Sequence, residues 1–518
     1  MHALTCCLVS LLFGFSLNDV PPCTDVYVIE VPQNIALAES GSFSVRISSN
    51  NLNEYQTLHV DFPDELILCD LHGKQDINVG LNNNTLIYRK NDMDDKQISY
   101  SVDNLAVGEY NGSMNMRIYL EDTTPSSVLT NGRNLNEILN SIDPTSISFQ
   151  TSFPYSKNDI DVSLGQDRSL LLNNDDRSVT IYPREGNMII ANPDMSKALG
   201  NLTKLETING INLLEMDECE NISSLFKGDI KLTAINGLDS FDTHNVTNMS
   251  RMFEMCTSLV RLNLNSLDTS NCSDMSYMFS HCLSLTTPGS LRNWDLAKCQ
   301  TCSYMFYNCP KLRNLGTMAS WDTSNITDMS SMFENCPVLI VTGDISGWNV
   351  SNVESFRSLF RLASSMRNIG NLGLWNISEN CHDLSYMFAE SEEILPDDLD
   401  LSDWNICNVS DASGMFRNCF SLGNLNIAGW NSHNLCNIAS MFECNSASKQ
   451  SHLQNVYGIE DLDVSNISDI SYAFYGARNF DVSRLKDWDL PSLINKNEAF
   501  GGGAGADVPS EIPAWYYD

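Results

Sequence analysis

The chain has 518 residues, more than one hydrophobic core usually supports, so we expect two or more structural units. Hydrophobic residues make up 42% of it and charged residues 18%, which excludes a wholly disordered chain and a multi-span membrane protein. With 30 Lys and Arg against 65 Asp and Glu, the formal net charge of −35 repels polyanions, so nucleic acid is not an expected partner.

The first residues predict a signal peptide. The apolar stretch from Leu8 to Leu17 has the length of a signal-peptide core and is too short to span a bilayer, and Gly14 and Ser16 are small residues that suit cleavage after Ser16. No later run of 18 apolar residues occurs. We therefore expect residues 1–16 to be removed, the mature chain to lack a membrane-spanning segment, and the protein to be extracellular or at the cell surface.

Residues 25–122 show strand periodicity. Phe43, Val45 and Ile47 alternate with polar residues, as in a strand with one buried face. The later segment GEYNGSMNMRIYLED, residues 108–122, resembles the closing strands of Ig-like domains in bacterial surface proteins. This resemblance implies an antiparallel Ig-like β-sandwich of about seven strands. Cys23 and Cys69 are a candidate disulfide pair inside it.

The next segment is interpreted as a connector followed by a cap. Residues 123–164 are rich in Ser, Asn and Asp, with one helical patch from Leu135 to Ile142. A strand from Ser178 to Pro183 and a helix from Met188 to Leu202 then predict a cap at residues 165–212. Such a cap would cover the first repeat, whose strand edge would otherwise be unpaired.

A repeat with a nearly fixed spacing occupies residues 213–500. Its blocks end in Phe at intervals of 26 to 28 residues, apart from one interval of 32. The eleven block ends are Phe226, Phe253, Phe279, Phe306, Phe333, Phe360, Phe388, Phe416, Phe442, Phe474 and Phe500.

Each repeat predicts a short helix followed by a strand. Met329, Met332 and Phe333 have the i, i+3, i+4 spacing of one helix face, with Thr327 and Asp328 before them as caps. Downstream stretches such as Leu422 to Ile427 alternate like a strand. The expected fold class is thus mixed α/β, an all-β Ig-like sandwich followed by a leucine-rich-type solenoid. The predicted core residues are Met252, Phe253, Met278, Phe279, Met305, Phe306, Met332, Phe333, Phe360, Phe388, Phe416 and Phe442.

The repeat resembles a known family. WDTSNITDMSSMFENC, from Trp321 to Cys336, closely matches the pattern W-D-T-S-N-V-T-D-M-S-x-M-F, followed by Cys three residues on, of BspA-like leucine-rich repeats in bacterial surface proteins. The resemblance implies surface display, adhesion and protein contact. The first block lacks the aromatic residue and the last has Lys496 and Ala499 in place of Met, as capping repeats would, so residues 501–518 form a tail or end cap.

Cysteine is abundant, with 17 residues, and Cys299-x-x-Cys302 has the spacing of a redox or zinc motif. Both cysteines, however, occupy repeat positions that are apolar elsewhere, Ile326 and Met329 among them. We therefore interpret them as small core residues. A disulfide between Cys272 and Cys299 stays open if their repeats bring them close enough.

Two further repeat positions invite functional interpretations. The position after the Trp holds Asp in six repeats, which suggests calcium, but four repeats hold Asn there, so turn capping is favoured and no metal or other cofactor is expected. Trp321, Trp348, Trp375 and Trp404 share one position and are candidates for a binding strip. Phe241, Leu267 and Leu462 fill that position in other repeats, which favours an apolar corner of the core.

The sequence lacks the motifs G-x-S-x-G and H-E-x-x-H, and GGGAG near the C-terminus lacks the Lys of a phosphate loop. We therefore expect a non-catalytic adhesion or protein-binding protein whose partner is a protein or glycoprotein, such as host extracellular matrix or mucin. In one alternative, the solenoid is a spacer that displays the N-terminal sandwich as the true binding module. A less favoured alternative is a hydrolase of surface glycans.

Overall fold

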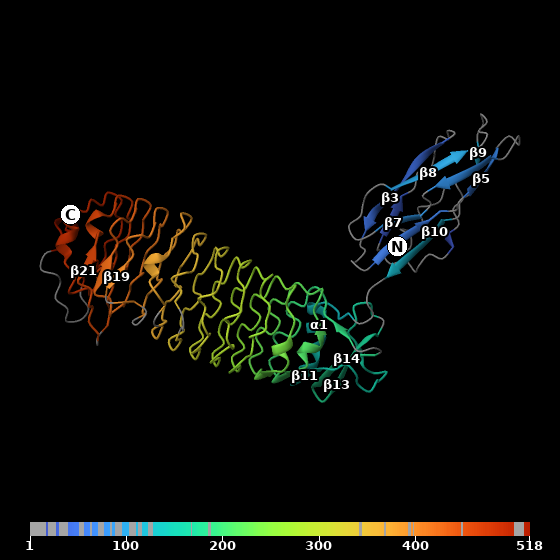
Figure 1. Cartoon of the computed structure of the whole chain (residues 1–518), viewed down its shortest axis with the longest axis horizontal. Helices are drawn as coiled ribbons and strands as arrows, with labels where there is room; N and C mark the ends of the chain where they lie inside the picture. Colours follow the sequence, from blue (N-terminus) through green and yellow to red (C-terminus); the bar gives the residue numbers. More distant parts are fainter. Residues whose placement is uncertain are drawn as a thin grey trace. The chain divides into compact units, whose positions relative to one another are not determined.

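Figure 1 shows the computed structural model of the chain, which divides into two compact units, residues 1–125 and 126–518. In the first unit the structure describes the ten strands named below and Phe62. In the second it describes residues 128–517, except 167, 185–187, 341–343, 367–368, 392–394, 397, 447–448 and 502–511. The predicted signal peptide and Cys23 lie outside the described residues, as does the side chain of Cys69.

The first unit contains two sheets. One has the strand order β1-β10-β4-β7 and the other β2-β3-β8-β6-β5-β9, and β1 with β10 is the parallel pair among otherwise antiparallel neighbours. The strands are β1 Leu17–Asn18, β2 Tyr27–Glu30, β3 Ser40–Asn50, β4 Gln56–Asp61, β5 Glu65–Asp70, β6 Ile77–Asn82, β7 Thr85–Tyr88, β8 Lys96–Val102, β9 Tyr110–Asn111 and β10 Met116–Asp122. The prediction of a seven-stranded Ig-like sandwich is wrong, because alternation locates strands but does not specify how they pair.

The second unit begins with a helix and a mixed sheet (Figure 1). Helix α1, Gly132–Ile142, starts at Asn131, whose side chain accepts the Asn134 N–H at 3.0 Å, and it buries Leu135 and Leu139. The sheet has the order β12-β13-β14-β11-β16-β18. Its strands are β11 Ser146–Phe149, β12 Ile160–Asp161, β13 Leu170–Asp175, β14 Ser178–Pro183, β16 Thr207–Asn209 and β18 Ala234–Ile235.

This beginning differs from the predicted connector and cap. The strand predicted from Ser178 to Pro183 is confirmed as β14. The segment predicted as a connector, however, supplies α1 and β11 to the packed core of the second unit and β12 to the edge of its sheet. In place of the helix predicted from Met188 to Leu202 there are turns and the short strand β15, Ile189–Ile190, which pairs in parallel with β17, Leu214–Glu215. Apolar residues there face inward from turns rather than from a helix.

Successive repeats pair in parallel from Asp194 to Asn495. The residue five before each block-ending Phe forms a bridge with its equivalent in the next repeat. These residues are Asn221, Asn248, Asp274, Thr301, Asp328, Ser355, Asp383, Asp411, Asn437, Asp469 and Asn495, preceded by Asp194. The neighbouring N–H groups also donate to the following repeat; those of Arg251 and Phe253 reach the carbonyls of Ser276 and Met278, both at 2.8 Å. Each repeat therefore satisfies its backbone through the next one.

The prediction of a helix in each repeat is wrong, because α1 is the only α-helix among the described residues. The residue two before each Phe has a φ between 53° and 60°, as in Tyr277 and Ser331. A right-handed helix cannot contain that left-handed conformation. The i, i+3, i+4 spacing instead belongs to a tight turn, in which Met329 N–H donates to Ser355 O of the next repeat and Met332 N–H donates to Met329 O, both at 3.3 Å.

The core of the solenoid is a column of stacked phenylalanines. Neighbouring rings from Phe226 to Phe474, and then Phe500, have centroids 5.2 to 5.9 Å apart. All twelve residues predicted as core are at most 2% exposed. At the far end, Trp515 and Tyr516 of the single-turn helix η6, Ala514–Tyr516, pack against Phe500 at 5.9 and 5.1 Å. The last residues thus cover the end of the stack.

Short strands occur at the start of the second unit and again in its C-terminal repeats. In the C-terminal repeats these are β19 Asp398–Asp400, β20 Asn424–Asn426 and β21 Asn455–Tyr457, which pair in parallel in that order. The strand predicted from Leu422 to Ile427 contains β20, in which Leu425 is buried while Asn424 and Asn426 face outward. Between the strands and the turns lie single-turn helices: η1 Ile211–Leu213, η2 Leu238–Ser240, η3 Leu372–Leu374, η4 Ile459–Asp461 and η5 Val482–Leu485.

Candidate functional site

The four candidate binding tryptophans lie inside the solenoid. Trp321, Trp348, Trp375 and Trp404 are 1% to 4% exposed, and the rings of Trp321 and Trp348 stack with centroids 5.9 Å apart. Each indole N–H donates to a backbone carbonyl of the preceding repeat, at 2.9 to 3.0 Å. Because both the ring and the polar N–H are used inside the stack, these side chains offer no binding strip to solvent.

Four cysteines of consecutive repeats also lie in the interior. Cys256, Cys282, Cys309 and Cys336 follow their Phe by three residues, and each thiol lies 2.9 to 3.1 Å from a Phe carbonyl of the preceding repeat. Burial raises the pKa of the Cys256 thiol well above its usual range and that of Cys336 to about 12. Protonated, buried thiols are poor nucleophiles and poor metal ligands.

The three cysteine pairs singled out from the sequence have different outcomes. Cys272 and Cys299 are free thiols, and their sulfurs lie 3.4 and 3.3 Å from the carbonyls of Asp274 and Thr301. Cys302 is buried with its sulfur 3.6 Å from Met332 Sδ, so Cys299 and Cys302 are core residues here. The Cys23 and Cys69 pair lies outside the described side chains.

The Asp and Asn position after the Trp caps a turn. In Asp322 a carboxylate oxygen accepts the N–H two residues on, that of Ser324, at 3.0 Å. In Asn349 and Asn405 the amide oxygen accepts the equivalent N–H at 3.1 and 3.2 Å. Hydrogen bonds from Ser324 hold the pKa of Asp322 below its usual value. The same bond forms with or without a charge, which is why Asp and Asn alternate at this position.

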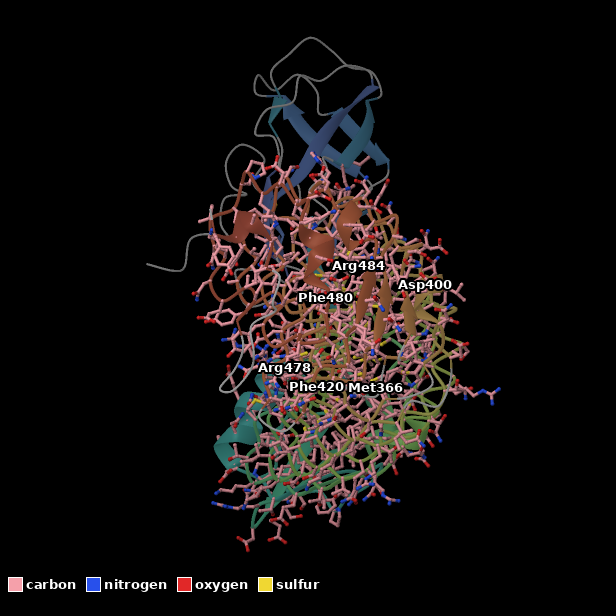
Figure 2. The ribbon with its side chains drawn as sticks, turned by 90° about the vertical axis from the view of Figure 1, so that its left-hand side faces the viewer. Met366, Asp400, Phe420, Arg478, Phe480 and Arg484 are labelled. Atoms are coloured by element: carbon pink, nitrogen blue, oxygen red, sulfur yellow. The ribbon has the colours of Figure 1, made fainter. Side chains whose placement is uncertain are left out.

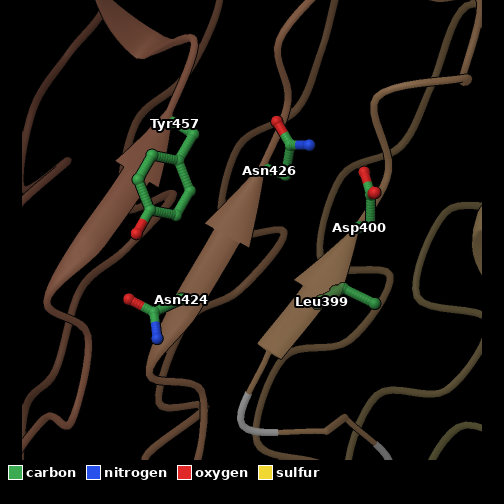
Figure 3. Close-up of a pocket in the computed structure, with 5 residues that line it drawn as sticks. All are labelled: Leu399, Asp400, Asn424, Asn426 and Tyr457. Carbon is green, nitrogen blue, oxygen red and sulfur yellow. The ribbon is translucent and has the colours of Figure 1, made fainter.

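The outer face of β19, β20 and β21 contains a hollow that the repeat pattern does not reveal. Leu399, Asp400, Asn424, Asn426 and Tyr457 line this depression of about 270 Å³, and Figure 3 shows their side chains across the three strands. Asn424 Oδ1 accepts from Asn455 Nδ2 at 2.8 Å. Asp400 Oδ1 accepts from the N–H and hydroxyl of Ser402 at 3.0 and 2.7 Å, and these bonds lower the pKa of Asp400.

The hollow continues toward the preceding repeat. A second depression of about 360 Å³ shares Leu399 and Asp400 and is lined further by Gly370, Asn371, Leu372, Leu395 and Pro396. Figure 2 labels Asp400, the last residue of β19, and Arg484, which lies in η5. The sequence analysis missed this site because it relied on repeat positions that hold similar residue types in successive repeats. The outward residues that line the hollow differ from repeat to repeat. The usable signal was the polar alternation Asn-Leu-Asn and Asn-Val-Tyr in two neighbouring repeats.

A family model described as "Mycoplasma protein of unknown function, DUF285" matches residues 193–317, 286–399, 313–422, 375–456 and 396–515. Together these matches span 193–515, more than half of the chain. The chain belongs to the DUF285 family. No curated protein and no solved structure matches it.

In this DUF285 chain, partly buried ion pairs link the matched repeats. Glu254 accepts from Lys227 of the preceding repeat and from Arg251, each at 2.9 Å. Arg417 lies between Glu390 and Glu443 of the two neighbouring repeats, 2.9 Å from each. These pairs favour one register between repeats, because a shifted register would separate the paired charges.

One group of three side chains among the described residues of the DUF285 chain offers metal-ligand atoms within 4.8 Å of one another: Asp217, Asp242 and His244. Both imidazole nitrogens already have neighbours, since Nδ1 lies 2.9 Å from Asp242 Oδ1 and Nε2 lies 2.8 Å from Asn245 Nδ2. The hydrogen bond with Asp242 raises the pKa of His244. Because Asp242 and Asn245 already occupy both ring nitrogens, we interpret the group as a hydrogen-bonded cluster and not as a metal site.

The described part of the DUF285 chain contains no helix that is both long and apolar enough to cross a membrane.

Proposed function

We propose that this protein is a non-catalytic adhesion or protein-binding protein, secreted or held at the cell surface, that uses its solenoid as an extended interaction surface. The observation that supports this most is how the recurring side chains are used. The indole of Trp348, the thiol of Cys309 and the amide oxygen of Asn349 all bond to backbone groups within the stack. The residues of the repeat motif therefore hold the fold together. The outward residues, which vary from repeat to repeat, are the ones available to bind a partner.

The sequence supports the same proposal. WDTSNITDMSSMFENC resembles BspA-like leucine-rich repeats of bacterial surface proteins, which implies surface display and adhesion. A net charge of −35 disfavours nucleic acid, so we expect a protein or glycoprotein partner, such as host extracellular matrix or mucin. Many modest contacts along the stacked repeats would supply the affinity.

Binding of the purified full chain to immobilised mucin, fibronectin and collagen tests the proposal. We expect saturable binding to at least one of them by surface plasmon resonance, and none to bovine serum albumin as control. Hydrogen exchange of the full chain with the bound ligand would then locate the contact, with protection expected in residues 193–515.

Three results would overturn the proposal. Protection confined to residues 1–125 would make the solenoid a spacer that displays the N-terminal unit. Hydrolysis of mucin glycans or of the bound protein by the pure chain would make the protein an enzyme. Failure to bind any of the three ligands would remove the support for adhesion.

A further inference from the structure

Three outward side chains form a row across neighbouring strands. Asp400 pairs in register with Asn426, and Asn426 pairs in register with Tyr457, so one side chain comes from each of β19, β20 and β21. Parallel strands lie about 4.8 Å apart, which spaces these groups at a regular short interval. Figure 3 shows all three at the hollow, with Asn424 beside them. The row therefore offers a carboxylate, an amide and a phenol ring to one ligand.

Tyr457 supplies a ring that is open on one side. Its side chain is 44% exposed, unusual for a large aromatic residue in this solenoid, where the phenylalanine column is buried. The Arg484 guanidinium, from the following repeat, lies 5.5 Å from the ring centroid and is held by Glu460 at 2.9 Å. The hollow lies toward the preceding repeats, on the side of β20. Tyr457 thus contacts a cation of the following repeat and also lines the hollow.

The polar groups beside this ring suit hydroxyl groups. Asp400 is ionised at neutral pH, since the bonds from Ser402 lower its pKa, and a carboxylate accepts about four hydrogen bonds in all. Asn426 Oδ1 accepts the Ala428 N–H at 3.1 Å, which fixes the direction of its amide. A carboxylate and an amide held in fixed positions can bind adjacent hydroxyls, while an aromatic ring packs on the apolar C–H face of a sugar.

We propose that the row of Asp400, Asn426 and Tyr457 is a binding site for an uncharged oligosaccharide, with one pyranose ring stacked on Tyr457. The proposal rests on the proposed adhesive function and names the class of ligand. The second hollow, which shares Leu399 and Asp400, extends the site toward Asn371 and accommodates further sugars. Anionic glycans are disfavoured by Asp400 and by the net charge of −35. Strand addition of a peptide does not fit, because the hollow lies on a sheet face and not at an edge.

Saturation-transfer NMR and calorimetry with the full chain test this site, with chitotriose, cellotriose and maltotriose as neutral probes and sialyllactose and hexalysine as charged ones. We expect at least one neutral trisaccharide to bind and sialyllactose not to bind. Tyr457→Ala should weaken that binding about tenfold, whereas Tyr457→Phe, which keeps the ring, should leave it within about twofold. Asp400→Asn should weaken it several-fold and should still fold, because Asn forms the same turn bond at Asn349 and Asn405.

Tyr155 provides a matched control. It is 50% exposed and also has an arginine over its ring, with Arg184 at 5.1 Å, but it lies in a different part of the second unit. Tyr155→Ala should leave saccharide binding unchanged, and equal melting temperatures would show that all variants fold.

Three results would overturn the glycan site: no neutral trisaccharide binds, binding is insensitive to Tyr457→Ala, or hexalysine alone binds at this face. If the chain nevertheless binds mucin or a matrix protein, and the trisaccharides do not compete, the adhesive function stands while the glycan site fails. If a trisaccharide binds but none of the three macromolecules does, the glycan site stands without the adhesive function.

Discussion

Asp229 Oδ1 accepts the backbone N–H of Leu202 from the preceding repeat at 2.7 Å. Asp229 is fully buried and stands three residues after Phe226, the position that Cys256 and Cys282 fill in the next two repeats. Its second oxygen, Oδ2, has no hydrogen-bond partner in the structure. A carboxyl group in this place is costly when ionised, so burial raises the pKa of Asp229 well above its usual value.

The first prediction concerns the pH dependence of this group. Because its folded pKa is raised, Asp229 binds its proton more tightly in the folded than in the unfolded chain. Below the unfolded pKa of about 3.9 the group is protonated in both states, and its contribution to the free energy of unfolding is fully present. As the pH rises toward the folded pKa, the unfolded chain releases this proton more readily than the folded chain, and the contribution is lost. Asp229→Asn keeps an acceptor for Leu202 and cannot ionise, so it should raise the free energy of unfolding at pH 7.5 and have little effect at pH 4.

Urea unfolding of the wild type and Asp229→Asn at the two pH values measures this difference. Asp239→Asn, at an exposed position nearby, is the control and should change stability by less than about 0.5 kcal/mol at either pH. A variant less stable than the wild type at pH 7.5 would contradict the assignment of a strained, buried carboxyl group.

The second prediction concerns the phenylalanine column. Phe333 stacks between Phe306 and Phe360 with centroid distances of 5.8 and 5.9 Å, and Met332 beside it is 1% exposed. Replacing either Met332 or Phe333 by Ala should cost about 2–5 kcal/mol, since neighbouring repeats cannot close the cavity without shifting their register. Urea denaturation followed by circular dichroism would show the loss. A change below about 0.5 kcal/mol at both sites would mean that they are not core residues.

The third prediction is that folding does not require calcium. Asn349 and Asn405 make the same turn bond as Asp322, so the capping geometry persists where the side chain has no charge. Thermal melting with and without excess chelator should give the same midpoint within about 2 °C. A large drop on chelation that added calcium reverses would show a metal-dependent solenoid, since a bound ion stabilises the folded state by linkage.

The fourth prediction concerns thiol reactivity. Cys436 is exposed, whereas Cys256, Cys282, Cys309 and Cys336 are fully buried with thiols that stay protonated. Iodoacetamide at pH 8 should therefore modify Cys436 in the folded chain and the four buried cysteines only after denaturation. Peptide mass spectrometry measures both. Rapid modification of Cys309 under native conditions would show that the stack opens, or that this thiol is not in the core.

The sequence by itself determined the period and the inward residues. Met332, Phe333 and Trp321 recur at a fixed interval with apolar substitutes, and only positions inside a stack of equivalent units vary in that way. Tertiary structure decided the conformation between them. The same i, i+3, i+4 spacing fits a helix or a tight turn, and the turn forms because the N–H groups find carbonyls in the next repeat, while Ser331 takes a φ of 54° that a helix forbids.

The outward face depended even more on tertiary structure. Asp400, Asn426 and Tyr457 belong to three repeats and are separated by 26 and 31 residues, with no shared residue type that would mark them as one set. The register of β19, β20 and β21 brings them into one row. The interval before Phe474 is 32 residues, longer than the others, so the average period of the repeat does not predict which residues of β20 and β21 pair. Residues that pack inside a repeat can be found from periodicity, whereas residues that meet across repeats depend on how the strands align.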